Sequence, residues 1–180
     1  GDLRTLVQAR SAAGGECQIH WFSRESRISL ELPFSFYESE VNPENSSATY
    51  REDPDDIDGP GAVVVAKATG VPVGQTNGFR LLAEESARIP RDGTFAREEV
   101  TVDGVPAIIQ EFEYHDRSLG LAVYRRELSA QIGNVIFSLV ALVPQERVEE
   151  YRPGLEHAFK TARFVLLPDV NRYAGSFSHE

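Results

Sequence analysis

The sequence predicts an α+β domain with about seven mostly antiparallel strands and two main helices. Three features of residues 94–164 indicate this fold: two strands around an Asp-Gly turn, a strand that is apolar on both faces, and an amphipathic helix that follows a proline. Side chains alternate between the two faces of a strand, whereas they return to one face of a helix every 3.6 residues. These two periods distinguish strands from helices along most of the chain.

The amino-terminal part gives weak signals. Its first apolar residues have helical spacing, so residues 1–16 are expected to form a short amphipathic helix and a flexible joint at the Ala-Ala-Gly-Gly run. Residues 18–23 and 28–32 look like strands on either side of a polar Arg-Glu-Ser turn.

The next part combines a polar stretch with a strand and a helix. Residues 38–61 are rich in Glu, Asp, Asn, Ser, Pro and Gly, so we expect a long mobile loop with a short strand near Thr49. Residues 62–69 are strand-like. Thr76 can cap a helix that runs to about Arg88 and stops before a proline.

Four strands with short turns are expected next. Side chains alternate over 95–102, and the Asp-Gly pair that follows tolerates the positive φ angles of a tight type I′ hairpin. The partner strand covers about 106–114, and two more strands cover 119–128 and 134–143. The last of these is apolar on both faces, which predicts a central strand covered from both sides.

Pro144 ends that strand and opens a helix, where its missing N–H donor has no cost. The proline at 153 is expected to kink this helix, or to separate a short first helix from a longer second one. One apolar stripe at helical spacing would face the sheet: Val148, Tyr151, Leu155, Phe159 and Ala162.

Length and composition agree with one soluble domain. The chain has 180 residues, of which 41% are hydrophobic, enough for a core without disulfides or metals. We expect this domain at 17–166 and a carboxyl-terminal tail at 167–180. No run reaches the ~18 apolar residues of a membrane span. The net charge of −10 argues against nucleic acid and anionic membrane surfaces as partners.

The sequence lacks the short motifs that mark common catalytic and cofactor sites. It has no Gly-x-Ser-x-Gly elbow, no phosphate loop and no dinucleotide fingerprint. Cys17 is the single cysteine, and no two of the four histidines lie at metal-ligand spacing. The carboxylates at 98, 99, 111 and 113 fall on one hairpin, but nothing indicates that they converge in a cleft. We therefore predict no catalytic residue, no cofactor and no enzymatic activity.

An aromatic group is the candidate binding surface: Trp21, Phe34, Phe36 and Tyr37. Trp21 is followed by a second aromatic residue on the same strand. Adjacent strand residues point to opposite faces, so both rings cannot enter one core layer, and one is expected at the surface. Packing of these rings in the core is the alternative interpretation.

The most acidic segment is a candidate cation site: Asp53, Asp55, Asp56 and Asp58. A glycine follows these residues, and hard cations such as Ca²⁺ bind several carboxylate oxygens. The register of an EF-hand does not fit, because a proline takes the first ligand position when the glycine is aligned. Weak cation binding and a solvated acidic loop are the two interpretations.

Three segments carry a resemblance to a known group. The strand and proline at 28–33, the Val-Asp-Gly-Val-Pro-Ala run at 102–107, and the strand at 134–144 before Tyr151 resemble the PsbP-like group. This group includes PsbP, the Ran-binding protein Mog, and DcrB-like and LpqN-like lipoproteins, and the resemblance covers 28–165. It implies an α/β/α sandwich with a central antiparallel sheet and helices on both faces. Its members are mostly non-catalytic and act through protein contacts or assembly.

These observations favour a non-enzymatic binding or assembly protein that contacts another protein. Homodimerisation through an edge strand is a further expectation. The alternative is a small-molecule-binding protein or a small enzyme with a pocket between sheet and helix. The compartment depends on the native start: a direct Met start favours the cytoplasm, whereas an export signal before Gly1 favours the cell envelope.

Overall fold

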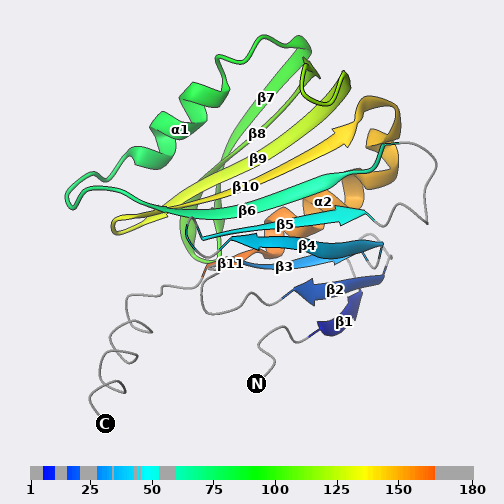
Figure 1. Ribbon diagram of the computed structural model, residues 1–180. Helices are drawn as coiled ribbons and strands as arrows, with labels where there is room; N and C mark the ends of the chain where they lie inside the picture. The colour runs from blue at the N-terminus through cyan, green and yellow to red at the C-terminus, as the bar shows by residue number, and fades with distance from the viewer. Residues whose placement is uncertain are drawn as a thin grey trace.

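A seven-stranded antiparallel sheet lies at the centre of the fold (Figure 1). The computed structural model describes residues 6–10, 16–20, 28–33, 35–42, 44, 46–52 and 60–164, the first two segments by their backbone alone. The strands follow one another across the sheet in the order β4 (Phe36–Asn42), β5 (Ser47–Glu52), β6 (Val63–Gly70), β10 (Val135–Pro144), β9 (Leu121–Ile132), β8 (Val105–Asp116) and β7 (Asp92–Val102).

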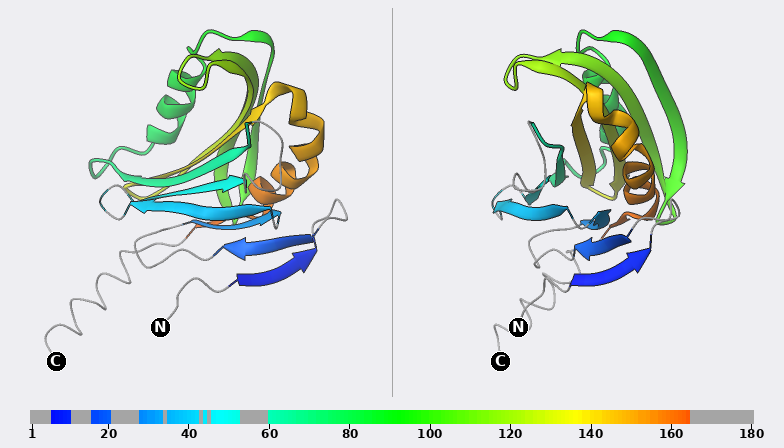
Figure 2. Two further views of the ribbon diagram at one scale, coloured as in Figure 1. Left: turned by 45° about the vertical axis from the view of Figure 1, so that its right-hand side comes forward. Right: turned by 90° about the vertical axis from the view of Figure 1, so that its right-hand side faces the viewer.

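Two helices cover opposite faces of this sheet (Figures 1 and 2). They are α1 (Gly78–Ser86) and α2 (Val148–Thr161), the latter preceded by the short 3₁₀ turn η2 (Gln145–Arg147). Phe79 of α1 packs on Ile136 of β10, whereas Leu155 of α2 belongs to the same core cluster as Phe137. Adjacent strand residues point to opposite faces, so these contacts confirm a sandwich with a helix on each side.

The central position predicted for the strand near Phe137 is confirmed, because β10 lies between β6 and β9 in the middle of the sheet. On the α2 face this strand is fully buried from Val135 to Val143. On the α1 face, Val140 and Leu142 are only half-buried. The expectation that both faces are covered is therefore wrong for this end of the strand, which α1 leaves uncovered.

A smaller sheet contains β1 (Leu6–Arg10), β2 (Glu16–His20), β3 (Ile28–Pro33) and β11 (Arg163–Phe164). Its member β3 packs against α2. The predicted helix within residues 1–16 is wrong for 6–10, which form a strand paired with β2. A helix of so few residues gains too few backbone hydrogen bonds to offset its nucleation cost, whereas a paired strand satisfies its backbone through a neighbour.

The polar stretch that begins near residue 38 contains the hairpin of β4 and β5. The short strand expected near Thr49 is confirmed as β5, whereas β4 lies where only loop was expected. Ala48 and Tyr50 are buried on one face, and the intervening residues of β5 point away from the core. A β-bulge between Glu38 and Glu40 shifts the register of β4. Strands with few inward-facing positions and a bulge do not show a clear alternation of polar and apolar residues.

Both helices differ in detail from the prediction. Asn77 precedes α1 without a capping hydrogen bond from its side chain, so the predicted cap at Thr76 is wrong. The helix α2 continues through Pro153, so the alternative with two separate helices is also wrong. A proline removes one N–H donor, and the packed stripe of α2 supports the helix across that position. No helix in the described ranges is long and apolar enough to cross a membrane.

Candidate functional site

Among the residues that the structure describes, only α1 packs on its face of the seven-stranded sheet, and it covers part of that face. Helix α1 packs against β8, β9 and β10, and its buried residues contact Ile108 and Ile136. On this same face, the part of the sheet toward its β4 edge carries side chains of β4, β5, β6 and β10. We call this surface, which α1 leaves uncovered, the open face, and its main side chains are Tyr37, Arg51, Val63, Val65, Lys67, Val140 and Leu142.

The strand register places these side chains together. Val65 lies opposite Val140, and Val63 lies opposite Leu142, so the four aliphatic side chains form one block on β6 and β10. All four side chains are half-buried. The residues next to them along each strand point to the α2 face and are fully buried. This alternation shows that the sheet has a sealed side and a partly solvated side.

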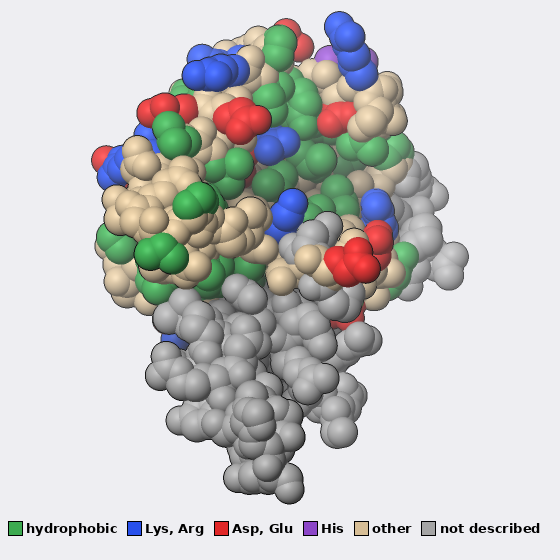
Figure 3. Space-filling view, turned by 60° about the vertical axis from the view of Figure 1, so that its left-hand side comes forward, with side chains coloured by type: hydrophobic (Ala, Val, Ile, Leu, Met, Phe, Trp, Pro, Cys, Tyr) green, Lys and Arg blue, Asp and Glu red, His purple; other side chains and the backbone are tan. Residues whose placement is uncertain are grey.

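Charged and aromatic residues border the aliphatic block. Arg51 lies opposite both Tyr37 and Val63, and Lys67 lies opposite Ser138. Tyr37 is 43% exposed, and both cations are exposed. No ion pair between described residues involves either cation. Figure 3 shows hydrophobic side chains gathered on the side of the molecule that carries α1, with Lys and Arg side chains beside them.

A buried polar network separates the open face from α1. The Glu127 carboxylate accepts hydrogen bonds from Arg125 Nε at 2.9 Å and from Gln110 Nε2 at 2.6 Å. Gln110 Nε2 also donates to the carbonyl of Ala83 in α1 at 2.9 Å. Because the charges of Arg125 and Glu127 compensate each other, this network fixes the position of α1 without adding net charge to the face.

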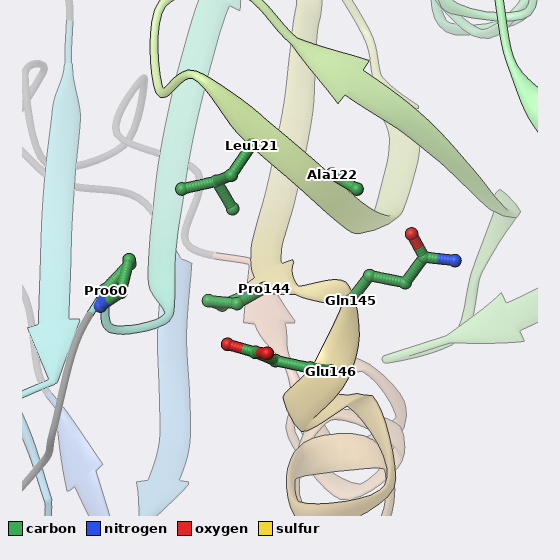
Figure 4. Close-up of a pocket in the computed structure, with 6 residues that line it drawn as sticks. All are labelled: Pro60, Leu121, Ala122, Pro144, Gln145 and Glu146. Atoms are coloured by element: carbon green, nitrogen blue, oxygen red, sulfur yellow. The ribbon is translucent and has the colours of Figure 1, made fainter.

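A pocket lies at the end of β9 and β10 (Figure 4). Its volume is about 430 Å³, and its lining is Pro60, Leu121, Ala122, Pro144, Gln145 and Glu146. Figure 4 shows Glu146 extending from the η2 turn toward the side of Pro60, while Gln145 extends away from it. Gln145 Nε2 donates to Glu113 at 2.7 Å. The lining is mostly apolar and offers one carboxylate without a histidine or nucleophile.

Beside this pocket, Glu52 forms a buried ion pair with Arg147. The guanidinium donates to both carboxylate oxygens, Nη1 at 2.8 Å and Nη2 at 3.0 Å, and the Ala62 N–H donates at 3.0 Å. The hydrogen bonds from Arg147 to Glu52 raise the pKa of Arg147. Three hydrogen bonds thus hold the two carboxylate oxygens, which is the pattern of a structural contact.

The paired carboxylates noted in the sequence do not form an acid–base site. Glu111 accepts hydrogen bonds from Tyr124 and from Arg126, and Glu99 pairs with Arg80 on the other face of the sheet. Burial, together with the Glu111 carboxylate, raises the pKa of Tyr124 to about 12, so this phenol stays protonated at neutral pH. The geometry among the described residues thus offers no convergent catalytic pair.

Two of the four predicted binding residues, Phe36 and Tyr37, belong to the described part of the chain. Phe36 is 2% exposed and packs edge-on against Tyr151, with ring centroids 5.9 Å apart. Tyr37 belongs to the open face. Trp21 and Phe34 lie outside the described residues. So do the predicted cation ligands Asp53, Asp55, Asp56 and Asp58, and within the described ranges no three His, Cys, Asp or Glu side chains could hold a metal ion.

The valines of the open face were missed by sequence reasoning. The signal was present, because the strand around Phe137 is apolar on both faces and therefore needs two covers. Only the structure shows that α1 is too short and too far toward β8 to supply the whole second cover.

Comparisons with known proteins agree with the fold. No protein-family model matches the sequence, and no curated protein matches it. LpqN of Mycobacterium tuberculosis, described as involved in cell envelope biogenesis, is 11% identical over 90% of this chain and 91% of its own, with a TM-score of 0.60. The cyanobacterial PsbP protein CyanoP of Synechocystis is 9% identical over 91% of this chain and 94% of its own, with a TM-score of 0.50.

A Bacteroides thetaiotaomicron protein also matches, with a TM-score of 0.52 and 14% identity over 77% of this chain, which spans 45% of that protein. The chain therefore has a PsbP/LpqN-like fold, as the resemblance implied. At these identities the likeness concerns the fold alone.

Proposed function

We propose that this protein is a non-enzymatic binding or assembly protein that contacts a partner protein through the open face. One observation carries the proposal: a block of four aliphatic side chains stays only partly buried on the α1 face, whereas their strand neighbours on the α2 face are fully buried. Apolar surface removed from water contributes about 25 cal/mol per Å², so a partner that covers this block gains free energy at no cost in internal packing.

The surroundings of the block support the same proposal. Contiguous apolar surface with a polar rim is typical of interaction sites, and Arg51, Lys67 and Tyr37 provide that rim. Tyr and Arg are also the side chains most enriched among residues that dominate binding energies. The fold likeness to LpqN, a protein involved in cell envelope biogenesis, is compatible with an assembly role.

Affinity capture with matched variants tests this function. The protein and its Val65→Thr/Val140→Thr variant are immobilised, and proteins retained from an extract of the source organism are quantified. Threonine keeps the β-branched shape, so the variant should fold, but its hydroxyls lack partners in an apolar interface. We expect specific partners to bind at least tenfold less to this variant and normally to the control Leu81→Ala, which changes an exposed residue of α1. Equal retention by all three proteins would reject the open face as the site.

A second candidate function is small-molecule binding in the pocket beside Pro144. Its volume of about 430 Å³ falls within the range of ordinary ligand sites. Its apolar lining with one carboxylate suits a small ligand that has an apolar body and a protonated amine. The substitution Leu121→Trp would fill the pocket. Ligand-observed NMR with a fragment library should then show hits for the native protein that disappear in this variant, and a library without such hits would remove this candidate.

A further inference from the structure

We propose that the partner places an amphipathic α-helix on the open face, with acidic side chains against Arg51 and Lys67. This inference rests on the proposed function and adds the chemistry of the partner. Three properties of the described residues support it: the width of the uncovered strip, the way α1 covers its own half of the sheet, and the charges at the rim.

The width of the strip suits one helix. The open face extends over β10, β6, β5 and β4, which are neighbours in the sheet. With strands ~4.8 Å apart, these four strands span about 14 Å, and a helix with its side chains is about 10–12 Å wide. The second helix of this protein, α2, lies on the opposite face, so the described part of the chain leaves this position unfilled.

Helix α1 shows how this sheet binds a helix. Its residues Phe79, Leu82 and Ala83, at positions i, i+3 and i+4, pack on Ile108 and Ile136. The aliphatic block of the open face presents a similar surface beside it on β6 and β10. A partner helix with apolar residues at the same spacing would complete a layer of two helices on this face.

The rim charges specify the polar side of the partner. Arg51 lies level with Val63, and Lys67 is four residues further along β6, so the two cations are about 13 Å apart along the strands. Glu40 also points to this face, which leaves an excess of one positive charge on a chain of net charge −10. On a helix that runs along the strands, two acidic residues seven or eight positions apart are about 11–12 Å apart and can reach both cations.

The β7 edge of the sheet is a weaker candidate for the same partner. The outer strand β7 carries Arg97, Glu98 and Glu99, all of them exposed. Charged side chains on an edge strand oppose the addition of a further strand. A partner that covers the face in a new layer avoids this edge.

A displayed library of helical peptides tests the inference. The library is selected on the native protein and counter-selected on the Val65→Thr/Val140→Thr variant, with Leu81→Ala as the control. We expect enriched peptides to combine an i, i+3, i+4, i+7 apolar stripe with two acidic residues seven or eight positions apart. Their affinity should fall at least tenfold for Arg51→Glu/Lys67→Glu, and it should weaken with added salt.

Several results would overturn the inference. These are enrichment of basic or non-helical peptides, no enrichment at all, or affinities that do not change in Arg51→Glu/Lys67→Glu. Self-association that Val65→Thr/Val140→Thr abolishes in sedimentation, or binding to anionic lipid vesicles through the same residues, would assign the face to another occupant and also overturn it. If captured natural partners depend on the open face but no helical peptide competes with them, the proposed function stands and only the helix is rejected.

Discussion

Single residues show how this fold tolerates charge inside its packed regions. The side chain of Glu52 is 2% exposed, yet three donors surround it, two from Arg147 and one from the backbone of Ala62. A buried ion pair contributes little net stability compared with apolar residues, but removing one partner leaves an uncompensated charge. The ion pair therefore affects the free energy of unfolding most when a substitution removes one of its two partners.

The first prediction concerns this pair. Glu52→Ala should lower the free energy of unfolding by about 3 kcal/mol, because Arg147 loses its buried partner and Ala62 loses its acceptor. Urea denaturation measures this change. The matched control is Glu150→Ala, which removes the exposed partner of the same arginine and should cost under about 1 kcal/mol. Similar losses for both variants would show that the pair acts as a surface contact.

The second prediction concerns pH. Hydrogen bonds from Ser118 Oγ and the Leu119 N–H hold the pKa of Asp116 below its usual value of 3.8. A carboxyl with a lowered folded-state pKa adds stability above its unfolded pKa and loses it as the pH falls through the folded pKa. The native protein should therefore be more stable than Asp116→Asn at pH 7, and the difference should shrink below about pH 4. Thermal unfolding between pH 2.5 and 7 checks this, and a constant difference would contradict it.

At the scale of elements, local signals decided which parts could be predicted from the sequence. The hairpin at Asp103 and Gly104 was predictable because its turn needs positive φ at both positions, and the observed φ angles are 51° and 73°. The hairpin of β4 and β5 carries no such turn signal and has a bulge, so its polar residues looked like a loop. The start of α1 at Gly78 depends on a contact with another element, which no local pattern reports.

The third prediction concerns that contact. A Cβ at Gly78 would lie 2.6 Å from Cδ1 of Ile136, so Gly78→Ala should destabilise the protein by about 1–2 kcal/mol although alanine favours helices. The second substitution Ile136→Val removes the clashing methyl group. The double variant should therefore be less destabilised than the sum of the single variants, by about 1 kcal/mol in a double-mutant cycle of urea unfolding. Strict additivity would show that α1 shifts to avoid the clash.

At the scale of the whole molecule, the resemblance to the PsbP-like group predicted the architecture but not the candidate site. The fold is set by turns, by the central strand and by the apolar stripe of α2, all of which lie within the range of the resemblance. The open face depends on where α1 stops relative to β6 and β5. That placement is a property of the assembled sheet, so no single segment of sequence could have indicated it.

The fourth prediction follows from the open face. The native protein should bind the dye anilinonaphthalene sulfonate, because the dye combines an apolar ring system with an anionic group and the face combines valines with cations. Val65→Thr/Val140→Thr should reduce the dye fluorescence several-fold while the free energy of unfolding changes by less than about 1.5 kcal/mol, since these side chains are only partly buried. Leu81→Ala should leave the fluorescence unchanged. Unaltered fluorescence in the threonine variant would place the dye elsewhere.

The contact between Glu52 and Arg147 joins positions 95 residues apart in the chain. During synthesis, β5 leaves the ribosome well before the segment that begins α2. Until that segment emerges, the Glu52 carboxylate lacks its partner Arg147. We therefore expect the end of β5 near Glu52 to stay solvated until α2 has formed and Arg147 can pair with this carboxylate. Folding of this part of the domain therefore depends on the synthesis of α2.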